Sequence, residues 1–162
     1  MSQQNARSGR AQTDAAPSNY EQTDHARRNI AGTSPWEPLV GYSRAVRAGP
    51  YVWVAGTTAT VQGVVMHPGD AAAQTRVALD IIAGALAEAG AELRHVVRTR
   101  IYVTDISQWE AVGRAHGEVF GEIRPAASMV QVTALIDPEH LVEVEAEAYL
   151  WDAPQEQEEE TR

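Results

Sequence analysis

The segment from residue 125 to residue 150, PAASMVQVTALIDPEHLVEVEAEAYL, decides the fold of this chain. Residues 128–133 and 141–150 alternate apolar and polar side chains, which is typical of strands with one buried face. Residues 136–138, Ile-Asp-Pro, predict a turn between these two strands. In the second strand glutamates occupy every other position, at Glu143, Glu145 and Glu147.

Residues 43–90 predict a hairpin followed by a helix. The strands 43–48 and 51–55 flank Gly49-Pro50, a dipeptide that suits a tight turn. Asp70 can cap the first turn of the helix, and Gly90 supplies a left-handed stop at its end. The apolar stripe of this helix has 3.6-residue spacing and consists of Ala78, Ile81, Ile82, Ala85, Leu86 and Ala89.

Residues 96–121 predict a further strand and a second helix. In the strand 96–103, one face carries Val97, Thr99, Ile101 and Val103, and the other carries Arg98, Arg100 and Tyr102. Residues 107–110, Ser-Gln-Trp-Glu, form a candidate capping box for a helix that ends near Gly121. Its expected apolar stripe is Trp109, Val112, Val119 and Phe120. The predicted fold class is therefore α+β with the order ββαβαββ.

Two helices can cover only one face of such a sheet. The other face mixes both signs of charge with aromatic groups: Arg98, Arg100, Tyr102, Glu143, Glu145, Glu147 and Tyr149. Such a face fits a subunit interface with cross-strand Arg–Glu pairs, and the alternative is a solvated, ion-paired sheet face. We therefore expect a homo-oligomer.

The composition indicates one domain, at 34–151, between two disordered ends. Residues 1–33 have no apolar period, so we expect a disordered arm, and 152–162 read as a disordered acidic tail. The chain has no cysteine, no apolar run long enough to span a membrane and no apolar signal core. We therefore expect a cytoplasmic protein without a membrane association.

Charge and motifs narrow the chemistry. The formal net charge is −9, lysine is absent, and no basic stripe is visible, so we expect no nucleic-acid partner. The histidines show no metal-ligand spacing, and no nucleotide-binding or hydrolase motif such as G-x-G-x-x-G, G-x-S-x-G or H-E-x-x-H is present. The sequence therefore predicts no metal and no cofactor.

Five short features occur in an order and spacing that resemble the Rid (reactive intermediate deaminase, YjgF-type) family. They are Gly41-Tyr42, Val54-Ala55-Gly56, Val103-Thr104-Asp105, Pro125-Ala126 and Val142-Glu143-Val144-Glu145-Ala146. The resemblance implies a mixed sheet backed by two helices, similar to trimeric chorismate mutase. It also implies a homotrimer with a central barrel and small-molecule sites in the clefts between subunits.

The resemblance also implies roles for particular residues. In deaminating members an arginine binds the substrate carboxylate, and a glutamate and backbone groups orient water; here Ala127 stands at the arginine position. Glu143 matches the catalytic glutamate, and Tyr42 and Gly56 match the tyrosine and the glycine of the cleft. Met129 and Gly113 depart from the pattern of those members. Because an arginine fork matches a carboxylate in shape and charge, ordinary 2-imino acid deamination is expected to be weak or absent.

Several of these residues have two interpretations. Arg124 or Arg100 could replace the missing cation, although a solvated loop arginine and an ion-paired arginine are the simpler interpretations. Glu143 suits acid–base work in a cleft or could pair with arginine, whereas Tyr42 could contact a ligand or fill an interface. His116 lies on the apolar stripe of the second helix, which favours a buried or interface histidine over a catalyst.

Two functions remain open from the sequence. The first is a cofactor-free enzyme that hydrolyses or isomerises a small imine or enamine, with Glu143 moving the proton. The second is a non-catalytic trimer that binds a small molecule or a pathway partner in the same clefts. Retention of Tyr42, Gly56 and Glu143 favours the enzyme.

Overall fold

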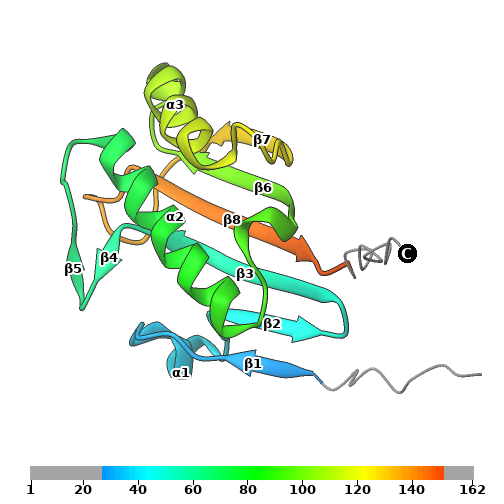
Figure 1. The fold of residues 1–162 in the computed structure, drawn as a ribbon. Coiled ribbons are helices and arrows are strands. Elements are labelled where there is room, and N and C mark those ends of the chain that lie inside the picture. The colour runs from blue at the N-terminus through cyan, green and yellow to red at the C-terminus, as the bar shows by residue number, and fades with distance from the viewer. Residues whose placement is uncertain (1–26, 152–162) are drawn as a thin grey trace, which may run out of the picture.

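A mixed sheet of six strands forms the centre of the computed structural model, which describes residues 27–151. The strand order is β1-β2-β3-β8-β6-β7, in which only the β6–β7 pair is parallel. The two long helices, α2 and α3, lie on the same face of this sheet (Figure 1). The elements are β1 (Arg28–Ile30), α1 (Trp36–Val40), β2 (Ala45–Ala48), β3 (Tyr51–Thr58), β4 (Thr60–Val61), β5 (Val64–Val65), α2 (Ala71–Glu88), η1 (Leu93–His95), β6 (Val96–Val103), η2 (Ile106–Gln108), α3 (Trp109–Phe120), β7 (Ala126–Gln131) and β8 (Val142–Tyr149).

The predicted ββαβαββ order is confirmed by β2, β3, α2, β6, α3, β7 and β8. The apolar core lies between the sheet and the two helices, as the alternation of the strands requires. Its largest members are Ile30, Val52, Val54, Leu79, Ile82, Leu86, Val96, Ile101, Val103, Val112, Phe120, Val142 and Val144. In the described part of the chain no helix is long and apolar enough to cross a membrane.

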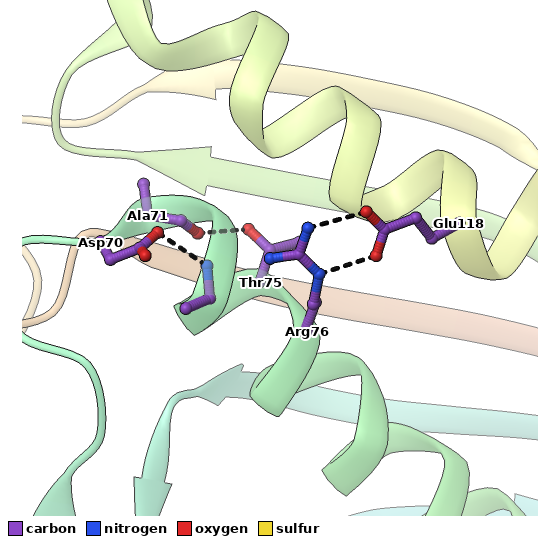
Figure 2. A network of polar contacts seen from close by, with 6 residues as sticks. Asp70, Ala71, Thr75, Arg76 and Glu118 are labelled. Atoms are coloured by element: carbon purple, nitrogen blue, oxygen red, sulfur yellow. Dashed lines mark hydrogen bonds and ion pairs between the residues drawn. The ribbon is translucent and has the colours of Figure 1, made fainter.

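The helix α2 begins and ends where the sequence predicts. The Asp70 carboxylate accepts a hydrogen bond from the Ala73 N–H at 2.9 Å (Figure 2). Gly90 has a φ of +77°. Arg76 then joins α2 to α3 through two hydrogen bonds of 2.7 Å to Glu118. Both side chains are about half exposed, so this pair orients the helices more than it stabilises them.

The start of α3 differs from the prediction. The expected capping box at 107–110 is absent, because the Asp105 carboxylate accepts from the Ser107 N–H at 2.9 Å and caps a 3-10 turn, η2, instead. The helix therefore begins only at Trp109, which is 57% exposed and does not join the core. Val112 and Phe120 of the expected stripe are buried.

The strand β6 also corrects one expected position. A β-bulge against β8 lies between Val96 and Arg98, so Val96 is buried and Val97 is 45% exposed. A bulge adds one residue to one strand and shifts the alternation at that point. From Thr99 onward the alternation is the predicted one.

The strands β7 and β8 do not lie side by side although they are consecutive in the chain. β6 lies between them, paired in parallel with β7 and antiparallel with β8. β7 is therefore an edge strand of the described sheet, next to α3 (Figure 1).

The N-terminal boundary was predicted too late. Residues 28–30, which we expected to be part of a disordered arm, form β1 and pair with β2, and Ile30 is 5% exposed. Three residues with one apolar side chain are too short to show an alternation, so the sequence pattern gave no sign of this strand. Residues 1–26 of the expected arm and the expected tail, 152–162, lie outside the described residues.

We expect Ile30→Ala to lower the free energy of unfolding by about 2 to 5 kcal/mol, because it empties a buried site. Urea denaturation of the full chain measures this value. The matched control is Ile136→Ala, at a position that is 78% exposed, which should change stability by less than about 0.5 kcal/mol. Equal effects of the two substitutions would show that β1 does not contribute to the core.

Candidate functional site

Glu143 lies on the face of the sheet that the helices leave uncovered. In β8 it alternates with buried Val142 and Val144, and its own side chain is half-buried. A β-bulge between Val54 and Thr57 interrupts the β3–β8 ladder opposite it. Gly56 lies in this bulge, and a Cβ built on Gly56 would lie 2.8 Å from Cδ of Glu143. The absence of a side chain at Gly56 is therefore what lets the carboxyl group lie against the β3 backbone.

The surroundings of Glu143 raise the pKa of its carboxyl group. Burial is the main cause, the charge of Glu145 adds to it, and the charge of Arg44 opposes it. A carboxyl group with a raised pKa exchanges a proton more readily near neutral pH, as a general acid–base residue must.

Arg44 is a member of this group that the sequence interpretation missed. Its Nη1 donates to the Gly56 carbonyl at 2.9 Å and to Thr57 Oγ1 at 2.8 Å, so it holds the bulge in place. Its guanidinium carbon lies 6.0 Å from the centre of the Tyr42 ring, within cation–π range. The only signal in the sequence was an arginine two residues after Gly41-Tyr42, which is too common a pattern to interpret.

Tyr42 borders a hollow of about 460 Å³ on the uncovered face. Neither Gly56 nor Glu143 contributes to its wall, so the hollow does not contain the Glu143 carboxyl group. The lining residues include Trp53 of β3 and the ion-paired Arg100 and Glu147.

The ion pairs of the uncovered face follow the expected cross-strand pattern. Arg100 Nη1 donates to Glu147 at 2.7 Å and to Glu145 at 3.4 Å, and the Tyr102 hydroxyl donates to Glu145 at 3.3 Å. Glu145 and Glu147 therefore have arginine partners, as the simpler interpretation held. Arg100 points to the face opposite Ala127, so within one chain it does not replace the missing cation.

Ala127 and Met129 lie in a different part of the molecule. In the parallel β6–β7 ladder Ala127 pairs with Thr99 and Met129 pairs with Ile101, whose side chains face the helices. Ala127 is exposed and Met129 is half-buried. With β6 between β7 and β8, and with the two groups on opposite faces, one chain does not bring Ala127 to Glu143.

Arg124 lies just before β7, on the same side of the molecule as Ala127. Its backbone is left-handed, with a φ of +54°, and its N–H donates to the Phe120 carbonyl at 2.8 Å, which closes the end of α3. Its side chain is exposed and makes no hydrogen bond or ion pair with the other described residues. Within the single chain Arg124 is therefore a solvent-exposed loop arginine.

Within residues 27–151, no group of three or more His, Cys, Asp or Glu side chains is placed to hold a metal ion. His95 and His140 are buried and hydrogen-bonded within the chain: the Glu92 N–H donates to His95 Nδ1 at 2.9 Å, and His140 Nε2 lies 2.7 Å from Thr60 Oγ1.

The described chain is a small α+β protein in which two helices cover one face of the sheet. The Glu143 carboxyl group lies on the other face, and β7 is an edge strand. The family model described as "Endoribonuclease L-PSP" matches residues 32–150. The chain belongs to this family, to which the names YjgF and Rid also apply. The predicted family is confirmed.

Relatives with known sequences and structures support this assignment. A Streptomyces coelicolor protein described as uncharacterised is 42% identical over 127 residues, which are 78% of this chain and 95% of that protein. The 3-aminoacrylate deaminase RutC of Acinetobacter baylyi is 38% identical over 120 residues, 74% of this chain and 93% of that protein. A crystal structure of a YjgF/YER057c/UK114 family member from Mycobacterium tuberculosis is 57% identical, with a TM-score of 0.71, and covers 77% of this chain and 100% of that chain.

Proposed function

We propose that this chain forms a homotrimer that hydrolyses or isomerises a small imine or enamine, without a cofactor, in clefts between neighbouring subunits. The observation that carries the proposal is the Glu143 carboxyl group, half-buried against Gly56 with a raised pKa. The name of the Acinetobacter baylyi relative, 3-aminoacrylate deaminase, supports this class of substrate.

The uncovered sheet face supports the assembly. Tyr51 stacks on Trp53 with ring centres 5.5 Å apart and meets Tyr149 edge-on at 5.0 Å, and all three side chains are exposed in the single chain. Tyr, Trp and Arg are enriched in subunit interfaces relative to the rest of a protein surface. Three such faces that close on one another would also bring Glu143 of one subunit towards β7 of the next.

The proposed reaction balances without an added reagent. The Glu143 carboxylate takes a proton from water as the water oxygen bonds to the imine carbon, and the C=N electron pair moves to nitrogen. Glu143 then returns the proton to nitrogen, which gives a carbinolamine. The hydroxyl proton of this intermediate next passes through Glu143 to the amino nitrogen, the C–N bond breaks as the C=O bond forms, and ammonia leaves a carbonyl product. Arg44 would hold the backbone at Gly56 beside the carboxyl group, and Tyr42 lies next to Arg44.

Two further features limit the proposal. Ala127 provides no charge for a carboxylate, so efficient turnover of ordinary 2-imino acids is not part of it. Cleavage of RNA is not part of the proposal, because a chain with a net charge of −9 and no lysine repels a phosphate backbone. The alternative is a non-catalytic trimer, because the same clefts could bind a small molecule without reaction.

Subunit complementation tests both the cleft and the role of Glu143. Glu143→Gln removes the base, and Ala127→Trp blocks the β7 side; each alone should lose at least about a hundredfold of turnover. When the two chains are mixed by co-expression, about a quarter of the clefts would combine two intact sides, so about a quarter of wild-type activity should return. Ammonia release from a panel of small imines generated in situ measures this, with exposed Glu122→Gln as the matched control.

The outcomes separate the hypotheses. Light scattering that gives a monomer, or mixtures that stay inactive although each variant is trimeric, would contradict the inter-subunit cleft. Wild-type protein that binds but turns over no imine of the panel would favour the non-catalytic alternative. In an active enzyme, turnover should fall as pH drops through the raised pKa of Glu143, because the base must be deprotonated to act.

A further inference from the structure

His116 of α3 reaches the sheet beside Ala127. Its Nε2 lies 3.0 Å from Thr99 Oγ1, and Thr99 is the Cα partner of Ala127 in the β6–β7 ladder. Paired residues in a ladder point to the same face and are separated by about one strand spacing, roughly 4.8 Å. The imidazole therefore contacts the residue that is paired with Ala127, the position at which deaminating members carry their arginine.

The space in front of this group is open. Gly113 precedes His116 by three residues on α3 and shares its side of the helix, and a Cβ built on Gly113 meets no atom within 4 Å. Ala127 is exposed. Glycine inside a helix is less favourable than alanine, and nothing in the described chain requires it here. Small residues on both sides thus leave room for a small molecule against His116.

The His116 ring is suited to bind an uncharged group. Burial lowers the pKa of His116, so the ring is neutral at pH 7, and it also packs against Phe120 with ring centres 4.7 Å apart. A neutral imidazole has one donor and one acceptor nitrogen. Thr99 occupies Nε2, whereas Nδ1 has no hydrogen-bond partner in the described chain and is not among its buried unpaired atoms. Nδ1 is therefore available to a ligand.

We propose that His116, held by Thr99, is a specificity-determining residue of the cleft and binds an uncharged polar group of the substrate, a carboxamide, in place of a carboxylate. This proposal rests on the proposed function. A carboxamide offers both a carbonyl oxygen and an N–H, so it pairs with Nδ1 in either tautomer. A carboxylate would instead lose its water beside Ala127 without gaining a cation.

Pyruvamide and pyruvate, the hydrolysis products of the matching imines, are the probes. In NMR titrations of the full chain, pyruvamide should bind at least tenfold more tightly than pyruvate and should shift the ¹⁵N resonances of the His116 ring. His116→Ala should weaken pyruvamide binding at least tenfold with little effect on pyruvate. His116→Gln, which keeps an uncharged donor and acceptor, should restore part of it. Exposed His67→Ala is the matched control.

A second variant keeps the test valid if His116→Ala is unstable. Thr99→Val preserves shape but releases Nε2, so it should weaken pyruvamide binding and leave the trimer intact. Unchanged pyruvamide binding in both variants, or pyruvate binding as tight as that of pyruvamide, would overturn the proposal. If Ala127→Arg binds pyruvate while the His116 substitutions leave pyruvamide binding unchanged, the proposed function stands and only this inference fails. If neither probe binds wild type or Ala127→Arg, both fail.

Discussion

Ala127→Arg is expected to release ammonia from 2-iminopropanoate about tenfold to a hundredfold faster than wild-type protein. A bidentate charged contact is worth about 2 to 5 kcal/mol when its partner is buried, and each 1.4 kcal/mol is a factor of ten. Ala127 is exposed, so the longer side chain has room to extend from β7. We expect only partial recovery, because Gly113 and Met129 also differ from the pattern of deaminating members.

Two further variants test whether the gain in turnover depends on the charge at position 127 and on Glu143. Ala127→Met adds length without charge and should leave turnover of 2-iminopropanoate at the wild-type rate. Adding Glu143→Ala to Ala127→Arg should abolish the gain, because the water loses its base. Efficient turnover of this acid by wild-type protein would show that Ala127 is not disabling. An Ala127→Arg trimer no faster than Ala127→Met would instead indicate that the cleft is remodelled.

The parts of the fold that sequence could predict are those with local signals. The Asp70 carboxylate caps α2 by accepting from the N–H of Ala73, three residues later, and Gly90 ends the helix with a positive φ. Both residues therefore act on neighbours in the sequence. The alternation of β8 likewise places Glu143 on the correct face. Each of these features depends on chemistry that neighbouring residues in the chain already contain.

The features that sequence missed depend on partners distant in the chain. The bulge at Val97 is a property of the β6–β8 pair, and an alternating strand shows the same pattern with or without it. Ile30 is buried because β2 and the helices provide a surface for it. The pairing of β7 with β6 could not be predicted either, because alternation does not show which strands are neighbours in the sheet.

The candidate site was predictable in its members but not in its arrangement. Glu143, Gly56 and Tyr42 came from resemblance, and the structure adds the reason for the glycine, which is the approach of the carboxyl group. Arg44 gave no usable signal, because its hydrogen bonds go to backbone exposed by the β3 bulge. The separation of Ala127 from Glu143 within one chain is visible only once the strand order is known.

Gly56→Ala is expected to lose at least about a hundredfold of imine turnover, within the range that a general base contributes, while the melting temperature stays within a few degrees. The added Cβ would lie 2.8 Å from Cδ of Glu143 and closer still to Oε1. The obstructed group is the end of a flexible side chain, so the carboxyl group moves and the backbone does not. The substitution therefore displaces the base without removing it.

Gly84→Ala is the matched control, because Gly84 is an exposed position of α2 and a Cβ built there meets no atom within 4 Å. It should raise stability by about 0.5 to 1 kcal/mol through helix propensity and leave turnover unchanged. Carboxyl ¹³C NMR adds a direct readout: in Gly56→Ala the pKa of Glu143 should move back towards its ordinary value, because the displaced carboxyl group is less buried. Full turnover by Gly56→Ala, with the pKa of Glu143 still raised, would show that catalysis does not depend on the carboxyl group lying against the β3 bulge.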